Sequence, residues 1–367
     1  MNGTVRPAPD LSVIRDDVRA ISAYAVPDST GLVKLDAMEN PFALPPEVAR
    51  ELGVRLGAVS LNRYPPADPR DFKDRLAQAI GLPAGMALLL GNGSDELIHL
   101  VIQACARPGA TVLSPWPSFE MYDLASRFDG CRFVGVPLAA DFSLPRDTLL
   151  AAIAAHRPAV VFIAWPNNPT GNLFDRATVE QVVEAAPGLV VLDEAYLPFA
   201  QDTWLPLLVR WPNLLVLRTF SKMGLAGIRL GYLCGDPAWI AEFNKVRPPY
   251  NVNVLTLAAA KFMLDRRVLL EAQAAALRAE RERLLARLRS APGVTAFDSA
   301  ANFILFRLAG GSEAADRVFA QVRARGILIK NRAHVHPLLA GCLRVTVGTP
   351  EENDAFVAAL SASLQEP

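Results

Sequence analysis

The stretch RTFSKMGLAGIRLGY, residues 218–232, directly follows the apolar run NLLVL at 213–217. It places Lys222 and Arg229 among three glycines, at the point where a buried strand is expected to end. Glycine lets the backbone turn tightly and approach a bound molecule closely. The pattern therefore predicts a strand followed by a turn that presents an amine and a guanidinium to one site.

Similar apolar runs recur on both sides of this stretch and alternate with longer helical segments, with Gly or Pro at the joins. Apolar runs without polar alternation are typical of strands that helices cover on both faces. We therefore predict an α/β fold with a mostly parallel seven-stranded sheet flanked by helices. The expected strands are 87–91, 111–114, 132–136, 159–164, 189–193, 214–218 and 230–234.

The pattern changes in the last third of the chain. Residues 255–291 form a long helical stretch rich in Ala, Leu and Arg, and isolated strands follow at 302–306 and 343–347. A length of 367 residues is typical of about two domains. We predict a large domain over 65–250 and a smaller α+β domain built from 1–64 together with 251–367.

Composition and charge exclude several classes of protein. Lys plus Arg and Asp plus Glu each number 37, so no net charge draws the chain to nucleic acid or to an anionic membrane. The N-terminal stretch lacks an apolar segment of signal-peptide length, and no run approaches the roughly 20 apolar residues of a membrane span. We expect a cytoplasmic protein that binds neither nucleic acid nor membrane.

Cysteine and histidine spacing gives no sign of disulfides or of a metal centre. The four cysteines lie far apart in mostly apolar settings without a CxxC pair, as is typical of reduced thiols in a core. His334 and His336 are close in sequence but have no third ligand nearby. We expect no metal site.

Polar residues follow four of the predicted strands, where the carboxyl ends of parallel strands leave a crevice. Ser94 and Asp95 follow one strand and open a helix, Asn168 follows a second, Asp193 ends a third, and Lys222 follows the fourth. Taken alone, Ser94 and Asp95 favour an ordinary helix cap, and Asn168 favours a turn. Asp193 ends a strongly apolar strand, so its carboxylate needs a cation or hydrogen bonds.

The four strand ends together supply donors for a phosphate, an amide, a carboxylate and a lysine. Pyridoxal 5′-phosphate needs this set, because it uses a lysine amine, an acid beside its pyridine nitrogen and donors for its phosphate. The sequence therefore predicts pyridoxal 5′-phosphate as the cofactor.

These residues lie in motifs of a known family. The chain resembles the class II, fold-type I aminotransferases, and among them it is similar to the histidinol-phosphate aminotransferases. The motifs, in chain order, are LDAMENPF (35–42), NRYPPAD (62–68), GNGSDELI (91–98), PSFEMY (117–122), PNNPTG (166–171), DEAYLPF (193–199), the opening stretch, RPPYNVN (247–253), ANFILF (301–306) and LRVTVGTPEEN (343–353).

The resemblance implies catalytic roles for four residues. Lys222 would carry the cofactor covalently and then move a proton between substrate and cofactor, as acid and base in turn. Asp193 would pair with the pyridine nitrogen. Asn168 and Tyr196 would form hydrogen bonds with the ring oxygen.

The resemblance also implies how the rest of the cofactor is held. Donors to its phosphate would be Ser94, Asp95, Thr219, Ser221 and Arg229. Phe119 would stack on the ring. Tyr64 would reach the phosphate of the neighbouring subunit's cofactor, so the resemblance implies a homodimer with shared active sites.

Substrate recognition is likewise implied by the resemblance. Arg344 would bind the substrate α-carboxylate through a planar pair of hydrogen bonds. Arg332, Tyr24 and Asn251 would meet the distal group, either a phosphate or the side-chain carboxylate of glutamate. Met38 stands where many relatives have Asn and would make the pocket more apolar.

The expected reaction transfers the amino group of L-histidinol phosphate to 2-oxoglutarate, giving imidazole acetol phosphate and L-glutamate in histidine biosynthesis. An aromatic amino acid aminotransferase and a threonine-phosphate decarboxylase of the same fold are alternatives. A regulatory domain that binds the cofactor without catalysis is a third, although only about 30 residues precede LDAMENPF and leave no room for a DNA-reading module.

Overall fold

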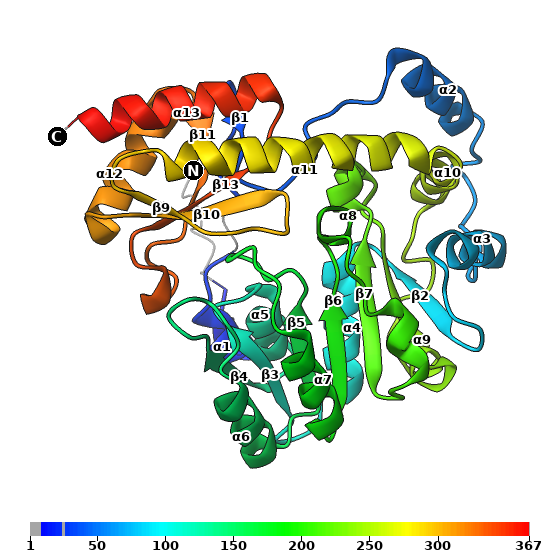
Figure 1. The fold of residues 1–367 in the computed structure, drawn as a ribbon. Coiled ribbons are helices and arrows are strands. Elements are labelled where there is room, and N and C mark those ends of the chain that lie inside the picture. The colour runs from blue at the N-terminus through cyan, green and yellow to red at the C-terminus, as the bar shows by residue number, and fades with distance from the viewer. Residues whose placement is uncertain (1–8, 24–25, 367) are drawn as a thin grey trace, which may run out of the picture.

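The computed structural model describes residues 9–23 and 26–366. Figure 1 shows a large sheet flanked by helices, with a smaller sheet and two C-terminal helices beside it, and the long helix α11 running across both parts. The site described below lies where these two parts meet.

The large sheet contains seven strands in the order β2-β8-β7-β6-β5-β3-β4. Their bounds are β2 (Ala87–Gly91), β3 (Thr111–Trp116), β4 (Arg132–Pro137), β5 (Val160–Ala164), β6 (Leu189–Asp193), β7 (Leu214–Thr219) and β8 (Gly231–Gly235). Neighbouring strands run parallel, except that β8 is antiparallel to both β7 and β2. The predicted α/β fold with a mostly parallel seven-stranded sheet is therefore confirmed.

The reversal of β8 follows from the length of its connection. Parallel neighbours need a crossover of about a dozen residues or more, usually a helix, whereas antiparallel neighbours can follow one another through a short turn. β7 and β8 are joined by residues 220–230, which form only two short 3-10 turns, over Ser221–Met223 and Ala226–Ile228. This connection is the stretch that carries Lys222 and Arg229.

Helices cover both faces of the large sheet. They are α3 (Arg70–Ile80), α4 (Ser94–Cys105), α5 (Met121–Phe128), α6 (Arg146–His156), α7 (Arg176–Ala185), α8 (Leu197–Ala200), α9 (Pro237–Val246) and α10 (Val254–Leu264). Alternate residues of β6 enter opposite cores: Val190 and Leu192 pack in the cluster that contains Trp204, and Leu189 and Val191 pack in the cluster that contains α4. This alternation explains why the strand is apolar throughout.

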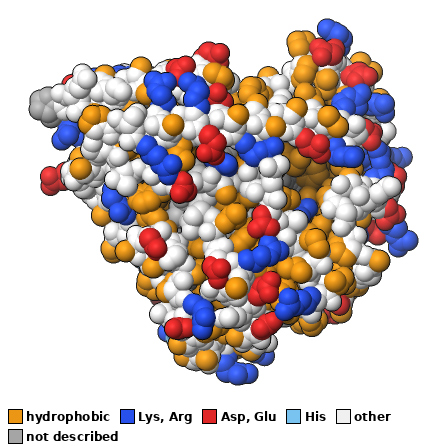
Figure 2. All heavy atoms as spheres, in the orientation of Figure 1, with side chains coloured by type: hydrophobic (Ala, Val, Ile, Leu, Met, Phe, Trp, Pro, Cys, Tyr) orange, Lys and Arg blue, Asp and Glu red, His pale blue; other side chains and the backbone are white. Residues whose placement is uncertain are grey.

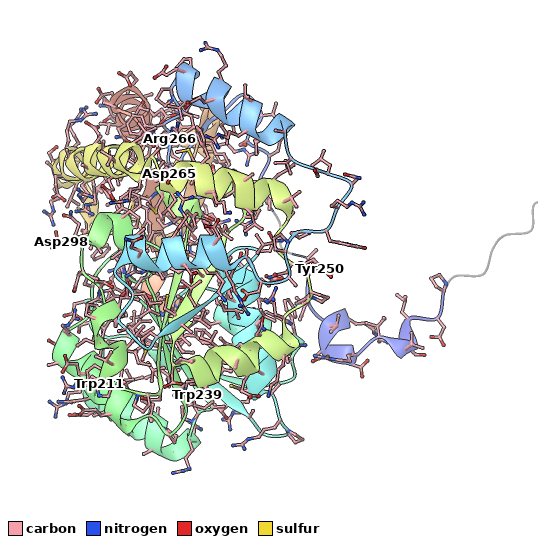
Figure 3. The ribbon with its side chains drawn as sticks, turned by 90° about the vertical axis from the view of Figure 1, so that its right-hand side faces the viewer. Trp211, Trp239, Tyr250, Asp265, Arg266 and Asp298 are labelled. Carbon is pink, nitrogen blue, oxygen red and sulfur yellow. The ribbon has the colours of Figure 1, made fainter. Side chains whose placement is uncertain are left out.

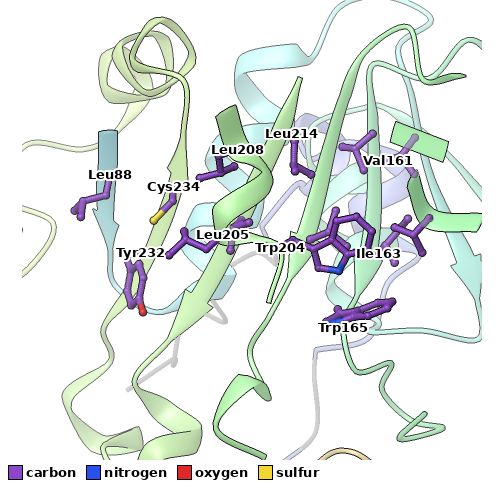
Figure 4. Close-up of a cluster of buried hydrophobic side chains, with 14 of the residues drawn as sticks. Leu88, Val161, Ile163, Trp165, Trp204, Leu205, Leu208, Leu214, Tyr232 and Cys234 are labelled. Carbon is purple, nitrogen blue, oxygen red and sulfur yellow. The ribbon is translucent and has the colours of Figure 1, made fainter. Parts of the chain in front are cut away.

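One of these cores is built around two tryptophans, shown in Figure 4. Trp165 and Trp204 are almost fully buried, and their ring centroids lie 5.3 Å apart in an edge-to-face arrangement. Val161 and Ile163 of β5 pack in the same cluster. Because Trp165 directly follows β5, this packing anchors the segment that leads to Asn168.

The smaller sheet is antiparallel, with strand order β12-β13-β10-β9. Its strands are β9 (Val294–Ala296), β10 (Phe303–Leu308), β12 (Lys330–Asn331) and β13 (Cys342–Thr346), and the helices α12 (Gly311–Ala324) and α13 (Pro350–Gln365) pack with it. A short N-terminal strand, β1 (Val33–Lys34), pairs in parallel with β11 (Ile327–Leu328). The N-terminal segment thus joins the C-terminal third, while the exact boundaries of the two domains stay a prediction.

The helical stretch at 255–291 is divided into α10 and α11 (Arg267–Arg289). The break is at Asp265 and Arg266, labelled in Figure 3, where Arg266 leaves helical geometry with φ −116° and ψ 23°. Asp265 forms an ion pair with Arg75, and the Arg266 guanidinium lies 3.7 Å from the centroid of the Phe262 ring. The Asp265–Arg75 pair joins residues 190 positions apart and leaves no mark in the local pattern, so the break was not predicted.

The remaining helices are α1 (Asp16–Arg19) and α2 (Pro46–Gly57). Within the described residues, none of the helices has both the length and the apolar character that a membrane crossing requires. On the face shown in Figure 2, basic and acidic side chains are interspersed and do not form a large patch of one sign.

Candidate active site

A cavity of about 240 Å³ opens beyond the carboxyl ends of β5, β6 and β7. All predicted cofactor ligands except Tyr64 line it, namely Ser94, Asp95, Phe119, Asn168, Asp193, Tyr196, Thr219, Ser221, Lys222 and Arg229. They come from separate segments of the large sheet, and residues 37–39 of the N-terminal segment close one side. The structure thus brings together the strand ends that the sequence singled out.

Lys222 sits in the first 3-10 turn after β7. Its Nζ donates a hydrogen bond to the Ala37 carbonyl oxygen at 3.2 Å and lies 5.8 Å from the centroid of the Tyr196 ring. Burial, followed by the charge of Arg344, lowers the pKa of Lys222 to about 8. A larger fraction of this amine is therefore neutral, and so nucleophilic, near pH 7 than for an exposed lysine.

Asp193 ends β6 and is buried. Its two oxygens accept hydrogen bonds from the Tyr122 hydroxyl at 2.8 Å and from the Ala195 N–H at 3.0 Å. Burial raises the pKa of Asp193 to about 6, and the Tyr122 hydrogen bond opposes this rise. Among the described residues no cation forms an ion pair with this carboxylate, so it has the capacity to receive a protonated ring nitrogen.

Asn168, Tyr196 and Arg344 are linked by hydrogen bonds. Asn168 Nδ2 donates to Tyr196 Oη at 3.2 Å, and Arg344 Nη1 donates to Asn168 Oδ1 at 2.5 Å. Arg344 Nη2 donates to the Asp36 carbonyl oxygen at 2.9 Å. Because Arg344 lies on β13, these contacts bring the smaller sheet to the cavity wall.

The opposite side of the cavity has the features of an anion site. Helix α4 begins at Ser94 behind Gly93, which has φ +89°, and no side chain caps its first turn. The cap predicted from Ser94 and Asp95 alone is therefore wrong, since both residues lie in the first turn itself. Uncapped N–H groups and the positive end of the helix dipole favour an anion.

A guanidinium and hydroxyls complete this side. Arg229 Nη1 donates to Ser221 Oγ at 3.4 Å, and Thr219 Oγ1 donates to Ser221 Oγ at 3.0 Å. A Cβ atom at Gly93 would lie 2.7 Å from Arg229 Nη2, and one at Gly231 would lie 2.7 Å from the Ser94 nitrogen. The space beside the helix end thus depends on glycine at both positions, and the donor set fits a phosphate.

The remaining predicted site residues do not line the cavity. Tyr64 is 81% exposed and stacks on Tyr250 with ring centroids 4.7 Å apart. Asn251 lies in a separate hollow and donates to Glu96 Oε2 at 2.6 Å. Arg332 is buried and does not line the cavity, and Tyr24 lies outside the described residues.

Two residues at the cavity have roles that the sequence did not reveal. Tyr122, the last residue of PSFEMY, is fully buried, and its ring stacks on Phe162 at 4.7 Å between centroids. The motif was quoted, but only the fold brings its phenol to Asp193. The second is Ala37, whose carbonyl group meets Lys222; a backbone acceptor carries no signature in the sequence.

Met38 lines the cavity, as expected from its place in LDAMENPF. Its backbone has φ +53°, in the left-handed region that non-glycine residues other than Asn and Asp seldom adopt. Two contacts hold it there: its N–H donates to Thr346 Oγ1 and Asn302 Nδ2 donates to its carbonyl oxygen, both at 3.0 Å. The segment that crosses the cavity is therefore locked to the smaller sheet.

Comparison with known proteins agrees with this geometry. Residues 30–360 match the family described as aminotransferase class I and II. A histidinol-phosphate aminotransferase of Cupriavidus pinatubonensis is 56% identical over 96% of this chain and 97% of its own length. One of Ralstonia nicotianae is 55% identical over 100% of this chain and 99% of its own length.

Solved structures share the fold. The histidinol-phosphate aminotransferase of Sinorhizobium meliloti, solved with pyridoxal 5′-phosphate, has a TM-score of 0.86 at 26% identity, covering 96% of this chain and 98% of that one. An L-threonine-O-3-phosphate decarboxylase of Porphyromonas gingivalis has a TM-score of 0.78 at 22% identity, covering 91% and 100%. The latter likeness concerns the fold alone. The matched family and the extent of these identities show that the chain belongs to the class I and II aminotransferases.

Proposed function

We propose that this aminotransferase transfers the amino group of L-histidinol phosphate to 2-oxoglutarate and so forms imidazole acetol phosphate and L-glutamate in histidine biosynthesis. The main support for this chemistry is that the Lys222 amine, with its lowered pKa, and the buried Asp193 carboxylate line the same cavity. The names of the curated relatives support the choice of substrate.

The cofactor is pyridoxal 5′-phosphate, which when bound supplies an aldehyde and a ring that accepts electrons. Asp193 would hold the ring nitrogen protonated, and Asn168 with Tyr196 would bind the ring oxygen. Phe119 would cover one face of the ring. The uncapped end of α4 with Arg229 and its hydroxyl partners would hold the phosphate.

Lys222 performs the proton transfer in this proposal. Once the substrate amine has released it, its Nζ is free to accept a proton from the substrate Cα and to return it at a different atom. A pKa of about 8 suits both directions, because it lies much closer to neutral pH than the ordinary lysine value of 10.5. The Ala37 carbonyl oxygen accepts a hydrogen bond from the amine and so restricts its position.

Arg344 would bind the substrate α-carboxylate through two parallel hydrogen bonds. It is already oriented by Asn168 and the Asp36 carbonyl group, so little ordering remains when substrate binds. Arg332, with Tyr24 and Asn251, would serve the distal phosphate or carboxylate. Asn251 lines a separate hollow and not the cavity, so its role in substrate binding would require the second subunit.

We propose a homodimer whose sites share residues. Apolar side chains of the N-terminal segment are exposed, with Leu11 at 58%, Val13 at 85% and Val18 at 40%. Figure 3 shows α1 projecting from the side of the molecule on which Tyr250 lies, and Tyr64 stacks on Tyr250 there. A second chain on this side would cover both features and bring Tyr64 to the partner's phosphate pocket.

We further propose that the enzyme acts in the cytoplasm, because all four cysteines are free thiols, as a reducing compartment maintains them.

The test of the substrate is a comparison of kcat/KM for L-histidinol phosphate and L-phenylalanine, each with 2-oxoglutarate. We expect a strong preference for histidinol phosphate, and a preference for phenylalanine would favour an aromatic amino acid aminotransferase. Release of carbon dioxide without any need for 2-oxoglutarate would instead identify a decarboxylase.

A further inference from the structure

Arg332, which receives the distal anion in the proposed function, forms an ion pair with Glu120, a residue that has no role in the reaction described above. Arg332 Nη2 donates to Glu120 Oε1 at 2.8 Å, and the two side chains are 7% and 29% exposed. Glu120 lies immediately before α5, and Arg332 immediately follows β12. The pair therefore bridges the large-sheet and small-sheet parts of the molecule.

The cavity is close to this pair. Phe119, the neighbour of Glu120 in the chain, lines the cavity, and so does Tyr196. Burial raises the pKa of Tyr196, while the charges of Arg344 and Arg332 oppose this rise. Arg332 is paired with Glu120, the residue that follows the cavity-lining Phe119, so we take the Arg332 guanidinium as the group that meets a ligand extending past Phe119.

Positive charge dominates this neighbourhood. Burial and then the charges of Arg332 and Arg344 lower the pKa of Lys330, whereas Asp36 and Glu120 act in the opposite direction. Glu120 is the carboxylate that contacts Arg332 directly, whereas Asp36 pairs with Lys34 at 3.5 Å. Without the charge of Glu120, the cluster would attract anions more strongly.

Arg332 also has hydrogen-bonding capacity left over. Its Nε is buried and forms no hydrogen bond with any described residue. A guanidinium binds a carboxylate or phosphate best through two parallel N–H groups, whereas Glu120 is bound through Nη2 alone. The present partner is thus replaceable by an anion of better geometry.

We propose that Glu120 is an internal counter-ion that a substrate's distal anion displaces from Arg332, and that Glu120 thereby sets the affinity for donors with an anionic side group. This inference rests on the proposed function, because it takes Arg332 as the residue that receives the distal anion. Donors with an uncharged side group leave the pair intact, so Glu120 does not oppose their binding. Glu120 acts through Arg332 and is a positioning residue.

The experiment uses the holoenzyme with one amino donor and no 2-oxoglutarate, and follows the cofactor absorbance as a function of donor concentration. For Glu120→Gln we expect the half-saturating concentration of L-histidinol phosphate to fall about tenfold, with the limiting rate changed less than about twofold. For L-phenylalanine we expect no change. Inorganic phosphate, as a competitor of the phenylalanine reaction, should inhibit at about tenfold lower concentration in this variant.

Three further variants serve as controls. Glu120→Asp keeps the charge and should behave nearly as the wild type. Glu120→Ala is a second neutral variant and should give the same result as Glu120→Gln. With two neutral variants, a folding defect in one of them does not decide the outcome. Glu184→Gln removes the same charge from the outer helix α7, where Glu184 pairs with Arg210 at 3.3 Å and both side chains are 52% exposed. It should change none of these quantities.

An unchanged or higher half-saturating concentration of histidinol phosphate in both neutral variants would overturn the proposal, as would an equal change for phenylalanine. If the wild type does not convert histidinol phosphate at all, the proposed function fails on its own. The role of Glu120 is then tested by comparing the half-saturating concentrations of L-glutamate and L-phenylalanine in the same variants, because glutamate also carries a distal anion.

Discussion

The hydrogen bond from Tyr122 to Asp193 is predicted to control the charge of the carboxylate that we propose to bind the cofactor. Tyr122→Phe removes only the hydroxyl, because both side chains fill the same buried place against Phe162. A hydrogen bond to a charged group contributes about 1.5–3 kcal/mol, and one pKa unit corresponds to about 1.4 kcal/mol. The pKa of Asp193, about 6 in the wild type, should therefore rise by about one to two units.

The consequence is a loss of negative charge at neutral pH. Near pH 7 the carboxyl group would be about nine-tenths ionised in the wild type and at most about half ionised in the variant. The ring nitrogen of the cofactor would then lose its ionised partner in much of the population. We expect the dissociation constant of pyridoxal 5′-phosphate to rise roughly tenfold at pH 7, measured by titrating apoenzyme and following tryptophan fluorescence.

A second readout needs no cofactor. The folded-state pKa of Asp193 lies above its value of 3.8 in a free chain, so the folded apoenzyme binds more protons between pH 4 and 6. Its unfolding free energy should consequently fall as the pH rises through this window. In Tyr122→Phe the fall should continue to about pH 7–8, as measured by urea unfolding of the apoenzyme across pH.

Tyr232→Phe is the matched control. Tyr232 is also buried, but its phenol contacts Arg218 and not a carboxylate of the site. It should leave the affinity for the cofactor and the pH window unchanged. The reasoning is refuted if Tyr122→Phe binds the cofactor as the wild type does and shows the same pH window, or if Tyr232→Phe produces the same shifts.

Three other predictions concern Lys222, Met38 and Glu194. Lys222→Ala should lose the covalent link to the cofactor and at least about 10³-fold of turnover. The lowered pKa of Lys222 also means that, between about pH 8 and 10.5, the unfolded wild-type chain binds more protons than the folded one, so the apoenzyme becomes more stable as the pH rises. Lys222→Ala should abolish this rise in stability. Met38→Asn should lower the unfolding free energy by about 1–2 kcal/mol in urea titrations, because the loss of a core side chain that is only 8% exposed outweighs the better tolerance of Asn for the φ of +53°; a gain in stability would contradict this account. Glu194→Gln should lower the unfolding free energy by about 3–5 kcal/mol, because the Arg218 side chain, only 6% exposed, would lose its buried charged partner at 2.9 Å. A change below about 1 kcal/mol would show that the pair is not stabilising.

Much of the fold and most of the residues that line the candidate cavity were predictable from the sequence. The seven strands of the large sheet lie within two residues of their expected ends, because each is a short apolar run bounded by Gly, Pro or polar residues. Lys222 and Asp193 lie at strand ends, and parallel strands bring such ends to one edge. The position of the cavity could therefore be predicted once the expected strands were taken to be neighbours, as β6 and β7 are.

Pairings between distant segments could not be predicted in this way. Tyr122 meets Asp193 across 71 positions, and Arg332 meets Glu120 across 212, so no local pattern marks either pair. Asn251 shows, conversely, that a residue of a recognisable motif can lie away from the cavity. It belongs to a quoted motif, yet within this chain it bonds to Glu96, away from the cavity.

What the amino-acid order determined by itself is therefore local: where strands stop, which turns need glycine, and which reactive side chains stand at those turns. These features depend on backbone sterics and on apolar periodicity, which act over a few residues. Only the tertiary structure decided which charges face each other and how strongly burial shifts them. Those properties depend on distances between segments and on the exclusion of water, and both arise only when the two sheets pack around the cavity.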